Sequence, residues 1–270
     1  MPRVRIAEDL ELNYELFGDD HAPAIVLIRG TGADGTRWMP QVEAYKQEFR
    51  ALIFDNRGAG KSDTPPGAYT VAEMAEDTIA LLDVVGIERC HLSGSSLGGA
   101  IALHIAIHHP DRVLSVQAHS SWLATEGYTA YSLGLLKRFL VEGGVDFYYD
   151  ATLPLLFSPR FMSTEFDRLM AVRDHMKSNP ATFDGLLGQI EANLTHDLRA
   201  RAGEITVPTL VTVGELDYLL PVAASEELHR AIPGSELVVF PGAPHLVTLE
   251  APDRFNEVTL DWLRKTVNRL

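Results

Sequence analysis

The stretch Gly94–Gly98 reads Gly-Ser-Ser-Leu-Gly, a G-x-S-x-G pattern that can hold a serine nucleophile at a tight turn. An apolar run, Cys90–Leu92, comes before it, and a run with a helical pattern, Ala100–Ile107, follows it. A strand that turns at once into a helix strains the residue at its tip, and only glycine-sized neighbours let the two elements pass so closely. The tip hydroxyl is then accessible, and free N–H groups of the helix lie beside it. The stretch therefore predicts a nucleophile and an oxyanion donor on one turn.

The register of this pattern selects Ser96 over its neighbour Ser95. Around Ser95, the two glycine positions would hold Ser93 and Leu97. The pentapeptide alone is a weak signal because glycine and serine are common in loops, and the flanking strand and helix are what strengthen it. We therefore expect Ser96 to be the nucleophile and the backbone N–H of Leu97 to face the oxyanion.

A serine hydroxyl becomes a good nucleophile when a base takes its proton, and imidazole does this best when a carboxylate fixes its tautomer. Of the 10 histidines, His245 lies in a loop directly after the apolar strand pattern Leu237–Phe240. Active sites of open α/β sheets collect at the carboxyl ends of strands, so we expect His245 to be the base. His119 and His175 stay open as pocket residues, and the others fall in helices, in a strand or at surface positions.

The acid of such a triad is expected at an equivalent place in the sheet. Asp217 follows the strand pattern Thr209–Val213 and would lie at the same edge as His245. Glu215 is the weaker rival, because its position is typical of a solvated turn residue. The sequence thus predicts Ser96, His245 and Asp217 as a catalytic triad.

Composition and charge limit the class of protein and partner. The 270 residues are 46% hydrophobic and 22% charged, as in ordinary globular proteins. A formal net charge of −14 argues against nucleic acid or an anionic membrane and leaves a small molecule as the expected partner. The single cysteine, Cys90, excludes an internal disulfide and a multi-cysteine metal site, and we expect no cofactor. The first residues lack the apolar stretch of a secretory signal, so a cytoplasmic location is predicted, while the oligomeric state stays open.

Apolar strand patterns alternate with amphipathic helical patterns at both ends of the chain. This alternation predicts an α/β fold with a mostly parallel central sheet and helices on both faces. The expected strands are Val4–Ile6, Leu10–Phe17, Ala24–Arg29, Arg50–Asp55, Cys90–Ser93, Val113–His119, Thr209–Val213 and Glu236–Phe240. The expected helices are Thr36–Gln47, Val71–Val85, Leu97–His108, Val222–Ala231 and Pro252–Val267.

Between residues 122 and 201 the strand signal stops, and the segment holds half of the chain's aromatic residues. We expect a core formed by residues 1–121 and 202–270 and an inserted helical cap formed by residues 122–201. Most of the rings are expected to pack the cap onto the core. Others, Trp122 and Tyr128 among them, are expected to line an apolar pocket over Ser96.

A glycine-rich stretch, Gly30–Gly35, matches the G-x-G-x-x-G fingerprint of a dinucleotide site, with Asp55 at the usual distance after it. An NAD-dependent oxidoreductase is therefore an alternative. It is disfavoured because a hairpin pattern precedes the stretch and because it leaves the triad without a role. In a hydrolase these glycines let the backbone approach the substrate, so that the N–H of Thr31 joins that of Leu97 in an oxyanion hole. Asp55 would then hold Arg57 and its loop.

Several segments together resemble the α/β-hydrolase fold over essentially the whole chain. They are the order Ser96, Asp217, His245, the loop Asp55–Ser62, which is similar to D-x-R-G-x-G-x-S, and Pro244-His245 followed by Glu250, Pro252 and Phe255. Within that family the chain looks most like small esterases, enol-lactonases and aminoacrylate hydrolases. The segments that carry this likeness are Met39-Pro40-Gln41, Asp55–Gly58, Gly143-Gly144 and Leu156–Pro159. Because this chain keeps a serine at the turn, unlike the aminoacrylate hydrolase, that relative's substrate is not carried over.

Arg29 departs from the family pattern, which commonly has histidine before Gly30. A permanent cation replaces a neutral ring at this position. Arg29 is expected to pair with a buried carboxylate such as Asp55 or Glu215, or else to attract a substrate that bears a carboxylate. Arg29 and Gly30 are therefore expected at the substrate.

The resemblance implies a cofactor-independent serine hydrolase that cleaves a carboxylic ester or a lactone. Cleavage of a carbon–carbon, amide or carbamate bond and perhydrolysis remain open, because they use the same triad. Dehalogenase and epoxide hydrolase chemistry are disfavoured, since they need a carboxylate where this chain has Ser96. A small-molecule receptor without catalysis is the alternative from another class.

Overall fold

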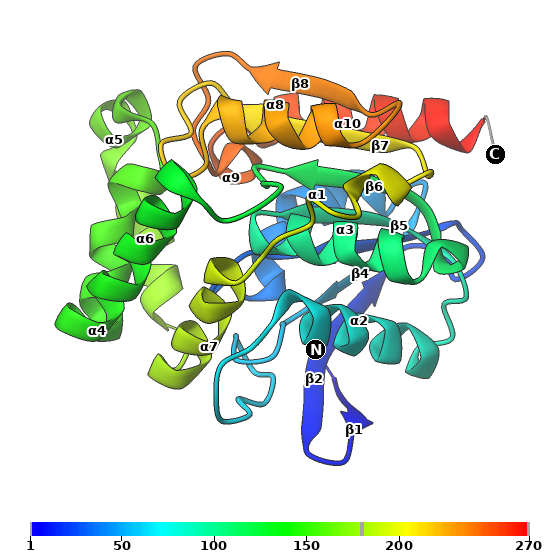
Figure 1. The fold of residues 1–270 in the computed structure, drawn as a ribbon, viewed down its shortest axis with the longest axis horizontal. Helices are drawn as coiled ribbons and strands as arrows, with labels where there is room; N and C mark the ends of the chain where they lie inside the picture. Colours follow the sequence, from blue (N-terminus) through cyan, green and yellow to red (C-terminus); the bar gives the residue numbers. More distant parts are fainter. Residues whose placement is uncertain (1, 179–180, 269–270) are drawn as a thin grey trace.

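The fold of the computed structural model is described for residues 2–178 and 181–268, and an eight-stranded sheet runs through its centre (Figure 1). The strand order is β1-β2-β4-β3-β5-β6-β7-β8. The strands are β1 Arg3–Ala7, β2 Leu10–Phe17, β3 Ala24–Ile28, β4 Arg50–Phe54, β5 Cys90–Ser95, β6 Val113–His119, β7 Thr209–Gly214 and β8 Glu236–Phe240. β1 and β2 pair antiparallel with their neighbours, and the six strands from β3 to β8 are parallel. The predicted mostly parallel sheet is confirmed.

Each strand of the sheet core has apolar side chains on both faces, as parallel strands covered by helices require. In β3, Val26 and Ile28 pack with α2 (Val71–Val84) and α3 (Leu97–His108) on one face. Ile25 and Leu27 point to the opposite face. There they join a second apolar cluster that contains residues of α1 (Met39–Tyr45) and α10 (Pro252–Val267). The remaining core helices are α8 Val222–Ala231 and the short α9 Val247–Glu250.

Most element boundaries agree with the sequence patterns to within a residue or two, and α3, α8 and α10 match them at both ends. One predicted helix, Thr36–Gln47, is instead split into a 3-10 turn, η1 (Gly35–Trp38), and α1. Asp34 caps the turn by accepting a hydrogen bond from the Thr36 N–H. Pro40 stands in the first turn of α1, where its missing N–H is tolerated, so the helix restarts there. Two further short 3-10 turns are η2 (Pro110–Arg112) and η3 (Ala202–Glu204).

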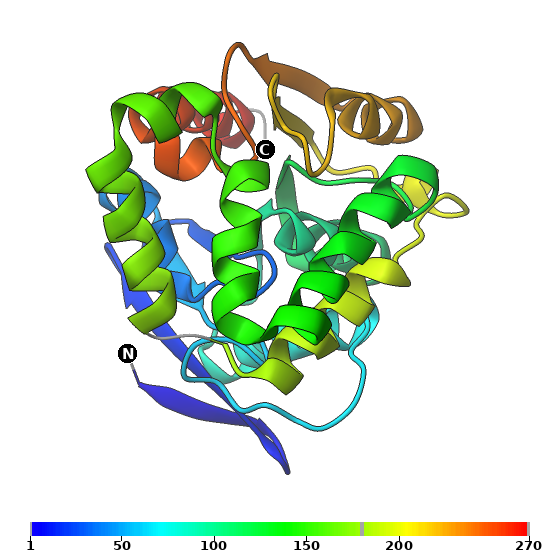
Figure 2. The same ribbon diagram turned by 90° about the vertical axis from the view of Figure 1, so that its left-hand side faces the viewer.

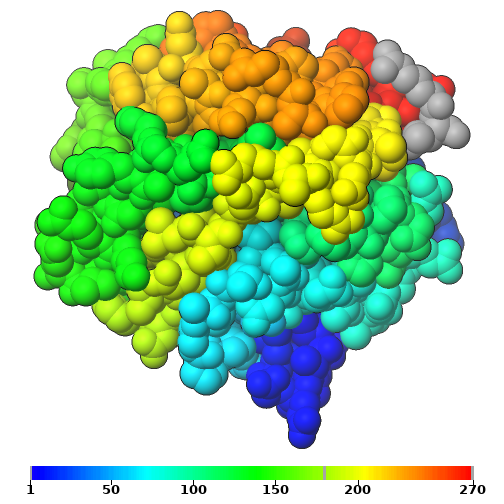
Figure 3. All heavy atoms as spheres, viewed as in Figure 1, coloured from blue at the N-terminus to red at the C-terminus, as the bar shows by residue number. Residues whose placement is uncertain are grey.

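Four helices, which we call the cap helices, lie between β6 and β7 in the chain. They are α4 Gly127–Leu156, α5 Pro159–Thr164, α6 Phe166–Ser178 and α7 Phe183–Leu194. They stand together on one side of the sheet and face the viewer in Figure 2. The long α4 bends at Gly144, whose φ of 76° lies in the region that favours glycine. Figure 3 shows the side chains of these helices packed directly against the rest of the chain.

Candidate active site

Ser96 stands at the tip of the turn between β5 and α3, with φ 55° and ψ −120°. This strained conformation is one that active-site turns often hold. The glycines around it are required by close backbone contacts. A Cβ on Gly94 would lie 2.1 Å from the carbonyl oxygen of Gly98, and a Cβ on Gly98 would lie 2.1 Å from that of Ile28. Strand and helix therefore cross at backbone contact and project Ser96 beyond the sheet edge.

The Ser96 side chain lines a cavity between the sheet and the cap helices. Its backbone N–H donates to the His119 carbonyl oxygen over 2.8 Å, which fixes the turn on β6. Gly30 packs beside it, and a Cβ on Gly30 would approach the Ser96 Cβ to 3.0 Å. The backbone after β3 thus comes close to the hydroxyl that the sequence predicts as nucleophile.

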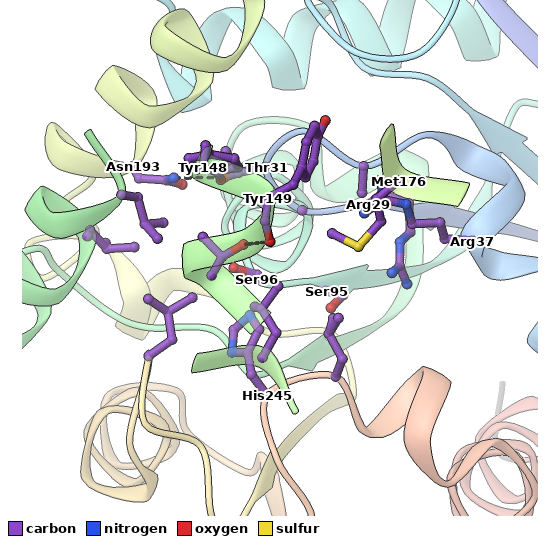
Figure 4. A pocket seen from close by; sticks show the side chains of 18 residues that line it. Arg29, Thr31, Arg37, Ser95, Ser96, Tyr148, Tyr149, Met176, Asn193 and His245 are labelled. Atoms are coloured by element: carbon purple, nitrogen blue, oxygen red, sulfur yellow. Dashed lines mark hydrogen bonds between the residues drawn. The ribbon is translucent and has the colours of Figure 1, made fainter. Parts of the chain in front are cut away.

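His245 and Asp217 are joined by a hydrogen bond of 2.8 Å between Nδ1 and Oδ2. The other carboxylate oxygen of Asp217 accepts the N–H groups of Leu219 and Leu220 at 3.1 and 2.8 Å. These bonds fix the carboxylate, which in turn orients the imidazole through Nδ1. The other ring nitrogen, Nε2, has no hydrogen-bond partner among the described residues. His245 lines the same cavity as Ser96, and Figure 4 shows the ring beside the serine.

Glu215, the rival for the acid position, is bonded elsewhere. Its Oε2 accepts the Gly242 N–H over 2.7 Å, in the loop after β8. The structure therefore brings Asp217, and not Glu215, to the imidazole.

Two backbone amides are the predicted oxyanion donors: Thr31 lines the cavity, and Leu97 directly follows Ser96 in the chain. Leu97 is the first residue of α3, where N–H groups have no partner within the helix. Within residues 2–178 and 181–268, neither amide has a hydrogen-bond acceptor. Two free N–H groups beside a serine hydroxyl can stabilise an oxyanion.

The cap helix α7 holds the Thr31 loop in place, a contribution that the sequence patterns did not reveal. Asn193 Nδ2 donates to the Thr31 hydroxyl over 2.8 Å. Gln189 Oε1 accepts the Gly32 N–H over 2.7 Å, and its Nε2 donates to the Arg57 carbonyl oxygen over 2.7 Å. The side-chain amides of Gln189 and Asn193 lie on one face of the helix because they are four residues apart. This spacing is the sequence signal that could have found them.

The cavity is small and closed by residues of both the core and the cap helices. Its volume is about 50 Å³. Its walls consist of Arg29, Gly30, Thr31, Ala33, Arg37, Ser95, Ser96, Leu133, Leu136, Tyr148, Tyr149, Thr152, Leu156, Met176, Asn193, Leu219, His245 and Leu246. Ligand pockets commonly reach about 300–1,000 Å³, so the cap side chains fill most of the space over Ser96.

Two predicted substrate contacts lie outside this cavity. Trp122 is fully buried in the core, where its indole N–H donates to the Thr125 hydroxyl and its ring packs edge-on against His196. Tyr128 is 56% exposed, and its hydroxyl donates to the Tyr218 carbonyl oxygen. The expectation that both rings line the pocket was wrong, because aromatic content does not show which way a ring faces. Tyr148 and Tyr149 of α4 occupy those walls instead.

Arg29 lines the cavity as expected, but it forms no ion pair with Asp55 or Glu215. Its Nη1 lies 3.5 Å from the Thr248 hydroxyl, and its guanidinium stacks 4.7 Å from the centre of the Trp38 ring. The predicted scaffold pairing is therefore corrected.

Asp55 also holds its loop differently from the prediction. Its carboxylate accepts the N–H groups of Gly35 and Lys61 at 2.6 and 2.9 Å and the side-chain amide of Asn13 at 2.7 Å. Arg57 pairs with Asp77 instead, through two hydrogen bonds of 2.5 and 2.7 Å. Because these three donors from different segments occupy the Asp55 carboxylate, it is not placed to bind a ribose, which further disfavours the dinucleotide interpretation.

The two other candidate pocket histidines do not line the cavity. His119 is buried in β6 and bonded to the hydroxyls of Ser93 and Thr212 at 3.0 and 2.8 Å. Burial, with a smaller effect of Arg29, lowers the pKa of His119 to about 3. His175 lies on α6 in a separate outer groove. In the described part of the chain, no group of three or more histidine, cysteine or acidic side chains is arranged to hold a metal ion.

The fold and this site define an α/β hydrolase. Residues 23–252 match the family described as alpha/beta hydrolase fold, and the chain belongs to that family. No helix in the described ranges is long and apolar enough to cross a membrane.

Curated relatives and solved structures agree with this family. A protein of Pantoea ananatis named "Putative carbamate hydrolase RutD" is 30% identical over 93% of this chain and 93% of its own. The enol-lactonase from Burkholderia xenovorans has a TM-score of 0.90 at 31% identity, covering 97% of this chain and 100% of that one. A thermophilic esterase from Thermogutta terrifontis has a TM-score of 0.88 at 28% identity, covering 98% and 99%. These similarities indicate a hydrolase that acts on a small molecule.

Proposed function

We propose that this protein is a serine hydrolase that cleaves a carboxylic ester or a lactone through an acyl-enzyme on Ser96. The observation that carries the proposal is the hydrogen bond between His245 and Asp217 in the wall of the cavity that Ser96 also lines. A serine, an oriented imidazole and a buried carboxylate are the parts of a nucleophilic triad.

In the first half of the reaction, Nε2 of His245 takes the Ser96 proton as the Ser96 oxygen attacks the carbonyl carbon. The carbonyl oxygen becomes an oxyanion and receives hydrogen bonds from the N–H groups of Thr31 and Leu97. Asp217 stabilises the imidazolium that forms. His245 then gives its proton to the leaving alcohol oxygen as the bond from carbon to that oxygen breaks.

In the second half, His245 takes a proton from water, and the water oxygen attacks the acyl carbon. The same two N–H groups receive the second oxyanion. The bond to Ser96 breaks, Ser96 regains its proton from His245, and the free acid leaves. In a lactone both products stay joined as one hydroxy acid.

Carbamate hydrolysis is the second candidate, because relatives at 30% identity carry that name. The same triad can attack a carbamate carbonyl, although nitrogen is a poorer leaving group than an ester oxygen. The enol-lactonase and esterase names of the solved structures support the ester or lactone as the first choice.

A substrate panel run on the wild-type protein and on Ser96→Ala tests the proposal. The panel contains methyl esters of increasing acyl length, a five-membered and a six-membered lactone, and methyl carbamate. Acid release from the esters and lactones is followed by titration, and ammonia release from the carbamate by a separate assay. We expect turnover of at least one ester or lactone and a loss of roughly 10⁵-fold or more in Ser96→Ala. Unchanged ester turnover by Ser96→Ala would refute the proposal. Turnover confined to methyl carbamate would favour the second candidate, and tight binding without repeated turnover would indicate a receptor.

A further inference from the structure

The cavity wall contains two arginine side chains and no acidic side chain among the described residues. Arg29, Arg37 and His245 line the cavity, and no aspartate or glutamate among the described residues does so. The chain as a whole carries 37 acidic residues against 23 lysines and arginines.

Arg29 is 1% exposed, and its Nε has no hydrogen-bond acceptor in the described part of the structure. Its contacts are the Thr248 hydroxyl at 3.5 Å and the face of Trp38. Burial, with the neighbouring Arg37 cation as the next cause, lowers the pKa of Arg29 to about 9. The guanidinium therefore remains charged at neutral pH without an anionic partner of its own. A buried cation of this kind is unfavourable unless an anion reaches it.

Arg37 is 8% exposed, and its Nε and Nη2 lack hydrogen-bond acceptors among the described residues. Asp34 forms an ion pair with Arg37 at 3.6 Å between Oδ2 and Nε, and its Oδ1 accepts hydrogen bonds from the Thr36 N–H and hydroxyl. Burial opposes ionisation of Asp34, but the Thr36 bonds and the Arg37 charge hold its pKa below the usual value. One ionised carboxylate thus serves two guanidinium groups, which leaves a local excess of positive charge.

A groove outside the cavity continues this charge pattern to the protein surface. Arg37 and Met176 belong to the walls of both the cavity and the groove. Arg168 and His175 also line the groove, and no acidic side chain of the described residues does. Figure 4 shows Arg29, Arg37 and Met176 on one side of Ser96. Arg37 therefore lies between the cavity and the groove, and no acidic side chain of the described residues lines either one.

We propose that Arg29 and Arg37 form a carboxylate-binding subsite, and that the substrate is an ester or lactone with a second, ionised carboxylate. This inference rests on the proposed function for the reacting carbonyl at Ser96. The two guanidinium groups would donate N–H hydrogen bonds to the carboxylate oxygens. The apolar part of the wall, formed by Leu133, Leu136 and Leu219, would contact the hydrocarbon part of the substrate.

A matched pair of esters tests the subsite. Methyl hydrogen glutarate and methyl pentanoate have acyl groups of equal carbon number, and only the first carries a carboxylate. We expect the wild-type kcat/KM to favour methyl hydrogen glutarate by about ten- to a hundredfold, the worth of a charge-assisted hydrogen bond. Arg37→Met and Arg29→Met should remove this preference, mainly by raising KM. Arg230→Met is the control, because Arg230 is an exposed residue of α8 whose ion pair is with Glu226, outside the cavity, and it should leave the ratio unchanged.

Since Arg29 is fully buried, a direct binding measurement keeps the test independent of that variant. Methyl hydrogen glutarate is titrated into Ser96→Ala and into Ser96→Ala with Arg37→Met by calorimetry. We expect binding to the first protein and a loss of about tenfold or more in the second. Equal Ser96-dependent turnover of both esters, with a ratio unchanged by Arg37→Met, would refute the subsite and leave the proposed function intact. Binding to Ser96→Ala without any Ser96-dependent turnover would refute the function and support the subsite.

Discussion

Nδ1 of His245 lies 2.8 Å from Oδ2 of Asp217, and both side chains are shielded from solvent. Asp217→Asn keeps the shape of the side chain but removes the charge that stabilises the imidazolium. We expect kcat to fall by about 10⁴-fold, as it does for this change in serine proteases. Glu215→Gln is the matched control and should retain wild-type kcat. Steady-state hydrolysis of the best ester checks both variants, and a loss below tenfold in Asp217→Asn would contradict the role of Asp217.

The contact between Gly98 and the Ile28 carbonyl oxygen predicts a strong stability effect. A Cβ at position 98 would overlap backbone atoms that cannot move aside, at 2.1 Å from that oxygen. We expect Gly98→Ala to lower the free energy of unfolding by about 3 kcal/mol or more. Gly134, within α4, has open space around its Cβ position, so Gly134→Ala should instead raise stability by about 0.5–1 kcal/mol. Urea unfolding of the two variants measures the contrast, and equal effects would contradict the packing described for the turn.

Buried histidines predict a loss of stability in mild acid. Burial lowers the pKa of His91 and of His196 to about 4, below the value of about 6.5 in an unfolded chain. At pH values between about 4 and 6.5, the unfolded chain binds protons at these histidines and the folded protein does not. Their contribution to the free energy of unfolding is therefore fully present above a pH of about 6.5 and is lost as the pH falls toward 4. Each such histidine contributes roughly 1.4 kcal/mol per pH unit in that window.

The variant His91→Asn isolates one of these contributions. Between pH 6.5 and 4.5, the free energy of unfolding should decline less steeply in this variant than in the wild type, because one buried histidine is missing. The carboxylates titrate in both proteins and therefore cancel in the comparison. The expected difference in slope is about 1.4 kcal/mol per pH unit. Parallel slopes would show that His91 does not stay neutral in the folded protein.

Met176 separates the cavity from the outer groove, which predicts that it limits acyl length. The side chain is buried in the wall of a cavity of about 50 Å³. We expect Met176→Ala to raise the relative kcat/KM for longer acyl chains by about tenfold, because it removes three heavy atoms from the entrance. Met162→Ala, in α5 and outside the cavity, should leave the chain-length profile unchanged. An unaltered profile in both variants would place the entrance elsewhere.

Cys90 is expected to be inert in the folded protein. It is fully buried in β5, and burial raises the pKa of its thiol to about 12. A thiol reagent should therefore modify it only after unfolding and leave ester hydrolysis unaffected. Spectrophotometric titration with a disulfide reagent, in buffer and in denaturant, checks this. Fast labelling of the native protein would contradict the burial.

Local patterns predicted the elements that position the site. The Gly94–Gly98 turn was recognisable because its glycines and serine follow a known local pattern between a strand and a helix. Asp217 and His245 were recognisable because each follows a strand of clear apolar pattern. The order of the parallel strands then brings these three carboxyl ends to one edge.

The sequence could not predict contacts that depend on how the cap helices are rotated and packed. Trp122 turned out to be a core residue, whereas Tyr149 and Met176 line the cavity. The partners of Arg29 were also mispredicted. The Trp38 ring stacks on the Arg29 guanidinium, and Trp38 belongs to the 3-10 turn that stands where the start of a helix was predicted.

Mass mapping of the adduct formed with a fluorophosphonate tests the central claim most directly, because the reagent captures an activated serine. Fragmentation of the peptide that contains residues 94–98 shows whether the adduct is on Ser95 or on Ser96. The account predicts one adduct per chain, on the Ser96 oxygen, with loss of ester hydrolysis in proportion to labelling and no adduct in Ser96→Ala. An adduct on Ser95, or full hydrolysis by a protein labelled on Ser96, would contradict it.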